Sequence, residues 1–289
     1  MDEKLVQAGE IRMQVRDYPH DGEAVIFLHF GGGNMHMWRD VVPFFTDDYR
    51  VVLADLRGHG RSDKPPGGYH IDRMAQDVVG VMDTLGISAA HLVGSSLGSE
   101  VGLSLAANYP KQALSLVCEG ALFNEGGPYG IYEGNAEAFA AHARKTLREL
   151  EARDEKTYPS VDAMVEESAC CFGEMGWWND VFASVVRHDA IETDDGHYVK
   201  SWERIALPYM RHALYYNFGD YYARVRCPVL LMPDTFPGQD EVELDIMARL
   251  FALIQNGRIV RVKDWVHPFG WMLMPESGSK AVLQFLQDI

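Results

Sequence analysis

The chain lacks the features that mark several large classes of protein. It has 26 Lys and Arg against 42 Asp and Glu, and the net charge of -16 opposes binding to the phosphate backbone of nucleic acids. No apolar run approaches the roughly 20 residues that a membrane helix needs. The acidic start, MDEKLVQAGE, has no apolar core of a signal peptide. We therefore expect a cytoplasmic protein with neither a nucleic-acid nor a membrane partner.

Cysteine is also scarce. The four cysteines form no CxxC pair, and the neighbours Cys170 and Cys171 do not have the spacing of zinc ligands. The sequence carries no nucleotide-binding motif that would indicate a cofactor. We expect no metal and no cofactor, and a small molecule as the binding partner; a homo-oligomer is compatible with the sequence.

Short apolar runs alternate with helical patterns along most of the chain. The expected strands are 24–30, 49–56, 89–94, 113–120, 227–232 and 257–262. The expected helices are 71–86, 97–110, 242–254 and 279–289. Such alternation predicts an α/β fold with a mainly parallel sheet that helices cover on both faces.

The alternation stops between about 122 and 225, where the sequence becomes helical and aromatic. A hundred residues are too many for a structureless loop. We expect an α/β core of residues 1–121 and 226–289 and an inserted helical cap of residues 122–225. The cap should lie over the carboxyl ends of the strands, where open α/β sheets bind ligands.

Ser96 lies in the stretch GSSLG, between an expected strand and an expected helix. Glycines relieve the crowding of a sharp strand-to-helix turn, and the serine hydroxyl then points out above the sheet beside the helix N-terminus. GxSxG occurs often by chance, and its alternative explanation is a tight turn. The strand before it and the helix after it favour a nucleophile.

A nucleophilic serine needs a base and an acid that orients the base, in the chain order serine, acid, histidine. His267 is the only histidine after His212, so it is the candidate base. The acid should follow strand 227–232. We favour Asp240, since the loop beyond the strand can reach the histidine, with Asp234 and Glu241 as alternatives. Asp240 could instead cap the next helix.

The stretch LHFGGGN at 28–34 ends a strand in three glycines. Such a loop lets backbone N–H groups approach a reacting oxygen, as an oxyanion hole requires. It lacks the Gly-Lys-Ser/Thr of a phosphate-binding loop. The N–H of Leu97, directly after the candidate nucleophile, is the other expected donor.

Taken together, these stretches resemble the α/β-hydrolase superfamily over nearly the whole chain. The resemblance rests on LHFGGGNMHMW, VVLADLRGHGRSDKP, HLVGSSLGSEVGLSLAANYP, CPVLLM and His267. It implies an eight-stranded, mostly parallel sheet with a cap inserted after the sixth strand. It also implies Ser96 as nucleophile, His267 as base and Gly31 as the second oxyanion donor, with Asp55, Arg57 and His59 bracing loops.

The sequence departs from the family pattern at three places. The loop after CPVLLM is a few residues longer than usual, which leaves the choice of the acid open. His29 is followed by Phe30 where the family has glycine, and Ser95 precedes the nucleophile where histidine is common. Dehalogenases and epoxide hydrolases of the superfamily have aspartate in place of Ser96, so those activities are disfavoured.

Aromatic side chains are frequent in the expected cap and near the candidate site, and they predict an apolar pocket. The candidate pocket residues are Phe30, Trp38, Ser95, Trp177, Trp178 and Phe269. We expect a serine hydrolase, carboxylesterase-like, that cleaves an ester-type bond in a small hydrophobic or aromatic substrate. One alternative is a carbon–carbon bond hydrolase of vinylogous β-diketones, and another is a ligand-binding protein of low activity.

Overall fold

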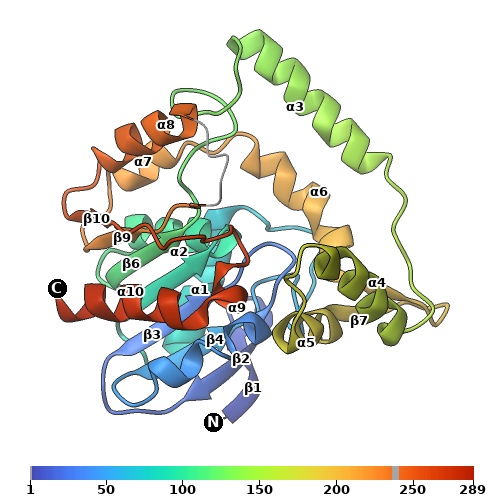
Figure 1. The fold of residues 1–289 in the computed structure, drawn as a ribbon, viewed down its shortest axis with the longest axis horizontal. Helices are drawn as coiled ribbons and strands as arrows, with labels where there is room; N and C mark the ends of the chain where they lie inside the picture. Colours follow the sequence, from blue (N-terminus) through green and yellow to red (C-terminus); the bar gives the residue numbers. More distant parts are fainter. Residues whose placement is uncertain (1, 236–240) are drawn as a thin grey trace.

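One mainly parallel sheet forms the centre of the molecule (Figure 1). The computed structural model describes residues 2–235 and 241–289, and its strands are ordered β1-β2-β4-β3-β5-β6-β9-β10. Their bounds are β1 (Asp2–Ala8), β2 (Ile11–Tyr18), β3 (Ala24–Leu28), β4 (Arg50–Ala54), β5 (Ala90–Ser95), β6 (Ala113–Glu119), β9 (Val229–Leu231) and β10 (Gly257–Ile259). β2 runs antiparallel to β1 and β4, and the other neighbours are parallel. The predicted α/β fold with an eight-stranded sheet is confirmed.

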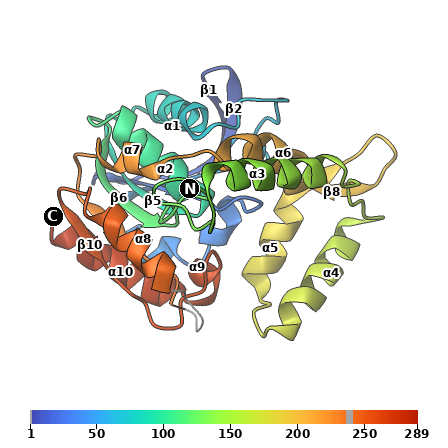
Figure 2. The ribbon, with the colours of Figure 1, turned by 90° about the horizontal axis from the view of Figure 1, so that it is seen from above.

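Helices cover both faces of this sheet, which Figure 2 shows from above. Strand β3 is buried at every residue, as a strand covered on both sides must be. One face packs against α1 (Ile71–Leu85), α2 (Leu97–Asn108) and α8 (Glu241–Phe251). The other packs against η1 (Met35–Trp38), η2 (Val42–Phe44), α9 (Gly270–Leu273) and α10 (Pro275–Gln287).

Residues 122–225, called the insert below, lie between β6 and β9 in the chain. The insert contains α3 (Ala136–Glu151), α4 (Val161–Glu174), α5 (Asp180–Asp189), β7 (Ala190–Glu192), β8 (Tyr198–Lys200), α6 (Ser201–Ala213) and α7 (Phe218–Tyr222). The helices match the expected helical character, whereas the antiparallel pair β7–β8 was not expected. In Figure 1 the long helix α3 extends over the upper side of the molecule.

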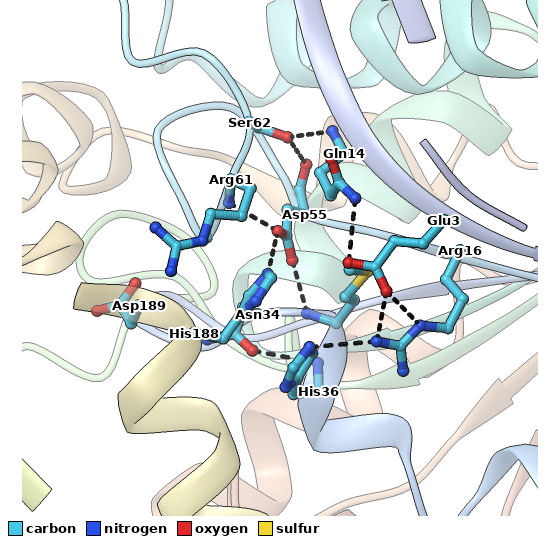
Figure 3. A network of polar contacts seen from close by, with 12 residues as sticks. Glu3, Gln14, Arg16, Asn34, His36, Asp55, Arg61, Ser62, His188 and Asp189 are labelled. Carbon is cyan, nitrogen blue, oxygen red and sulfur yellow. Dashed lines mark hydrogen bonds and ion pairs between the residues drawn. The ribbon is translucent and has the colours of Figure 1, made fainter. Parts of the chain in front are cut away.

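A polar network fastens helix α5 of the insert to the loops of the sheet (Figure 3). His188 Nε2 lies 2.7 Å from Asp55 Oδ2, and Asp55 Oδ1 accepts the Met35 N–H at 2.9 Å. His36 stacks on His188 with ring centroids 4.0 Å apart, and its Nδ1 lies 2.7 Å from Ser184 Oγ. Asp55 therefore braces loops, as the sequence predicted.

No helix within 2–235 and 241–289 combines the length and the apolar character needed to cross a bilayer.

Candidate active site

Ser96 occupies a strained turn between β5 and α2. Its φ of 49° and ψ of -117° are unfavourable for a residue with a side chain. The turn is tight enough to require glycine on both sides: a Cβ on Gly98 would lie 2.0 Å from the Leu28 carbonyl oxygen, and one on Gly94 2.4 Å from the Ser99 nitrogen. The backbone thus fixes Ser96 at the end of the strand, at the N-terminus of α2.

A cavity of about 410 Å³ contains Ser96 and opens at the carboxyl edge of the sheet. His267, Gly31, Leu97 and Phe30 also line it. The fold therefore brings the predicted nucleophile, base and oxyanion-hole residues to one place from distant parts of the chain. Residues of the insert complete the wall, namely Leu122, Phe123, Glu125, Trp202, Tyr209, Met210, Ala213 and Phe218.

The carboxylate that contacts His267 is Glu119, at the end of β6. His267 Nδ1 lies 2.6 Å from Glu119 Oε1, and Ser95 Oγ donates to Glu119 Oε2 at 2.6 Å. The register of the sheet explains the contact between Ser95 and Glu119, because these two residues are paired across the neighbouring strands β5 and β6. Glu119 is fully buried, so its charge acts in a medium that screens it weakly.

The sequence reasoning missed Glu119 and looked for the acid after the strand 227–232. Asp240, the favoured residue, lies outside the described residues. Asp234, the alternative, lines the cavity, but the residue hydrogen-bonded to His267 Nδ1 in the structure is Glu119. The available signal was a glutamate at the end of an apolar strand, ALSLVCEG, followed by glycine. In the described part of the chain, no group of three or more His, Cys, Asp or Glu could hold a metal ion.

The charged groups around His267 favour its role as a base. Burial opposes its protonation, but the carboxylates of Glu119 and Asp234 outweigh burial and raise the pKa of His267 above its ordinary value. The contact with Glu119 uses Nδ1, and this leaves Nε2 for a proton from a nucleophile. No hydrogen bond joins Ser96 to His267 between these two described side chains; such contacts often tighten only when substrate binds.

The backbone N–H groups of Gly31 and Leu97 line the cavity and have no acceptor among the described residues. The N–H of the next residue, Gly32, is already used, since it donates to His59 Nε2 at 3.0 Å. Gly31 packs against Trp202, whose ring lies 2.6 Å from where a Cβ would stand. The free pair is suited to receive a negatively charged oxygen.

Two buried histidines hold the glycine loop in place. His29 Nε2 accepts the Leu56 N–H at 2.9 Å, and His59 Nδ1 lies 3.0 Å from the Arg57 carbonyl oxygen. Burial lowers the pKa of His29 to about 4 and that of His59 well below its ordinary value, so both are neutral. The predicted bracing role of His59 is confirmed by its bond to Gly32. Arg57 braces α1 through Asp77, with Nε 2.7 Å from Oδ2.

Most aromatic residues predicted for the pocket lie elsewhere. Trp38 is fully buried in the core against Phe27 and Trp271, which corrects its assignment to the pocket. Ser95 is likewise fully buried and contacts Glu119 rather than the cavity.

Trp177, Trp178 and Phe269 do not line the cavity that contains Ser96. They belong to an aromatic cluster with Phe182, in which Trp177 and Phe269 have ring centroids 5.8 Å apart. Phe30 is the one predicted pocket aromatic found in that wall. The sequence shows that these residues are aromatic, but it does not show which of them pack in the interior and which line the pocket.

Comparisons with known proteins agree with this architecture. The family model described as alpha/beta hydrolase fold matches residues 23–235. A putative carbamate hydrolase of Caulobacter segnis is 43% identical over 107 residues, 36% of this chain and 40% of that protein. A 2-hydroxy-6-oxononadienedioate/2-hydroxy-6-oxononatrienedioate hydrolase of Comamonas testosteroni is 40% identical over 149 residues, 50% of this chain and 48% of that protein. The matches thus span about half or less of these relatives.

The whole chain also superimposes on solved structures. The crystal structure of E-2-(acetamidomethylene)succinate hydrolase has a TM-score of 0.74 and 23% sequence identity, over 99% of both chains. At this identity the likeness concerns the fold. Together with the family match over most of its length, the sheet order and the serine turn, it places the chain in the alpha/beta hydrolase fold family.

Proposed function

We propose that this protein is a serine hydrolase that cleaves an ester-type bond by acyl transfer to water. Ser96 acts as the nucleophile, His267 as the base and Glu119 as the carboxylate that orients the base. The observation that carries the proposal is the 2.6 Å contact of His267 Nδ1 with Glu119, in the same cavity as Ser96 in its strained turn.

The reaction follows from this arrangement. Ser96 Oγ attacks the substrate carbonyl while His267 Nε2 takes its proton, and the carbonyl oxygen becomes negatively charged. The N–H groups of Gly31 and Leu97 bind that oxygen. His267 then gives the proton to the leaving alcohol as the carbon–oxygen bond breaks. In the second half, His267 activates a water that releases the acid and restores Ser96.

Glu119 supports the reaction without touching substrate. Its negative charge stabilises the imidazolium that forms as Ser96 loses its proton, and it fixes the tautomer with hydrogen on Nδ1. Ser95 holds the second oxygen of this carboxylate. The pair of adjacent strands therefore supplies both the nucleophile and the group that orients its base.

The alternative of carbon–carbon bond cleavage uses the same Ser96 and His267. The relative from Comamonas testosteroni has a dienedioate, a dicarboxylate, in its name. No Lys or Arg stands among the described residues that line the cavity of this chain, so a dicarboxylate would lack a cationic partner there. This observation favours ester-type substrates over that alternative.

Steady-state kinetics with two substrate sets test the proposal. One set contains p-nitrophenyl esters of short aliphatic and aromatic acids, and the other a vinylogous β-diketone whose cleavage releases a dienoate. We expect ester hydrolysis that Ser96→Ala abolishes. Cleavage of the diketone without ester hydrolysis would replace the proposal by the carbon–carbon alternative. Turnover of neither, with tight binding of apolar ligands, would favour the ligand-binding protein.

A further inference from the structure

Apart from His267, the charged side chains around the cavity are all acidic. Besides His267, the ionisable acids and bases in its wall include Glu100, Glu125, Asp234 and Glu243, and no Lys or Arg lines it among the described residues. The cavity is a candidate active site through Ser96, His267 and the unpaired N–H groups. The carboxylates are therefore used only to infer which substrate the cavity binds.

Glu100 is the carboxylate closest in the chain to the reaction centre. It follows Ser96 by one turn of α2, and its N–H donates to the Ser96 carbonyl oxygen at 3.2 Å. Ser96 and Glu100 both line the same cavity. A group bound by Glu100 would thus lie a few bonds from a carbonyl that Ser96 attacks.

Tyr209 fixes the Glu100 side chain, since its hydroxyl donates to Glu100 Oε2 at 2.7 Å. None of Glu100, Glu125 and Glu243 forms an ion pair with Lys or Arg in the described part of the chain. No Lys or Arg of the described residues is therefore placed to pair with these three carboxyl groups. Burial raises the pKa of Glu100 to about 7, and the Tyr209 hydrogen bond acts against this, so the carboxyl ionises near neutral pH.

Aromatic rings line the same cavity as these carboxylates. Trp202 and Tyr209, with ring centroids 5.7 Å apart, form one part of the wall, and Phe123 and Phe218 form another. The faces of aromatic rings attract cations, and Trp does so most strongly. Carboxylates next to aromatic faces are the combination that binds an ammonium group with attached carbon.

We infer that the substrate is a cationic ester, with an ammonium group a few bonds from the scissile carbonyl, and that Glu100 determines this specificity. The inference rests on the proposed serine hydrolase function and names its substrate class. The ammonium group lies between Glu100 and the rings of Trp202 and Tyr209. The substrates named for the dienedioate and succinate hydrolases are dicarboxylates, so their charge is opposite to that of the ester proposed here.

Two pairs of isosteric esters separate charge from shape. Choline butyrate and 3,3-dimethylbutyl butyrate place the test group on the alcohol. Phenyl 4-(trimethylammonio)butanoate and phenyl 5,5-dimethylhexanoate place it on the acid, and monophenyl glutarate supplies an anion. We expect kcat/KM for one of the cationic esters to exceed that of its neutral isostere about tenfold or more. Equal or lower values for both cationic esters, or a preference for glutarate, would overturn the inference.

The variant Glu100→Gln tests the assigned residue. It should bring the ratio of cationic to neutral kcat/KM close to one. Glu166→Gln removes the same charge from the exposed side of α4 and should keep the wild-type ratio. A ratio that Glu100→Gln leaves unchanged would contradict the role of Glu100.

A binding measurement separates this inference from the proposed function. On Ser96→Ala, calorimetric titration compares choline with its neutral isostere 3,3-dimethylbutan-1-ol. Tighter binding of choline supports a cation-binding cavity even if no ester is hydrolysed. Hydrolysis of neutral esters without any preference for cations would leave the serine hydrolase intact and refute the cationic substrate.

Discussion

Replacing Glu119 with glutamine should lower kcat/KM for the best ester about 10³–10⁴-fold. The carboxylate is fully buried, and its two oxygens contact His267 Nδ1 and Ser95 Oγ at 2.6 Å each. Glutamine keeps the size of the side chain but removes the charge that stabilises the imidazolium. A loss of 10⁴ corresponds to about 5 kcal/mol of transition-state stabilisation.

Two further variants make this prediction discriminating. Asp234→Asn and Asp240→Asn remove two of the acids that the sequence offered, and each should keep kcat/KM within about tenfold of wild type, well short of the loss expected for a triad member. Far-ultraviolet circular dichroism verifies that each variant is folded. If Glu119→Gln retained activity within tenfold and Asp240→Asn or Asp234→Asn lost it, the assignment of the acid to β6 would be refuted.

Four more outcomes follow from the structure. Because burial opposes protonation of His267 but Glu119 and Asp234 outweigh it, kcat/KM should fall as pH drops through a midpoint above about 6.5; a lower midpoint would count against this electrostatic balance. Ser95→Ala removes a donor from Glu119, so the same midpoint should move upward while kcat falls about tenfold or more, since a hydrogen bond to a charged group contributes about 1.5 kcal/mol or more; an unchanged pH profile would show that Ser95 does not act on Glu119. His29 has a pKa of about 4 through burial, below the ordinary 6.5, so the stability that it contributes is intact above pH 6.5, and the His29 share of the free energy of unfolding should fall by about 3 kcal/mol as pH drops to 4. Urea unfolding at pH 7.5, 5 and 4 measures this decrease, and a flat profile would contradict it. His188→Ala leaves Asp55 without its histidine partner and should cost about 3 kcal/mol in thermal unfolding, whereas His197→Ala, at an exposed site, should cost less than about 1 kcal/mol; equal losses would show that the network of Figure 3 adds little.

The elements around the nucleophile were predictable because their signals are local. The apolar runs at 24–30 and 89–94 overlap β3 and β5, and the glycines around Ser96 mark the turn that the backbone adopts. Within the main sheet, the antiparallel strands β1 and β2 at the start of the chain were the ones that lacked an individual prediction. Their alternating burial holds one polar face in solvent, which weakens the apolar signal.

The orienting acid and the pocket wall were less predictable because they depend on contacts between distant segments. The contact of Glu119 with His267 follows from the pairing of β5 with β6 and from the path of a loop 148 residues further along. Trp38 and Trp202 are both aromatic, yet one lies in the core and the other in the cavity wall. Packing of the insert decides this difference, and residue spacing does not encode it.

The most direct test of the account is the intact mass of the protein after treatment with a fluorophosphonate. The reagent forms a stable adduct only with an activated serine, and peptide mapping identifies the residue. We predict one adduct on wild type at Ser96, none on Ser96→Ala, and slow labelling of Glu119→Gln. An adduct that persists on Ser96→Ala, or a folded wild type that forms none, would contradict the central claim that His267 and Glu119 activate Ser96.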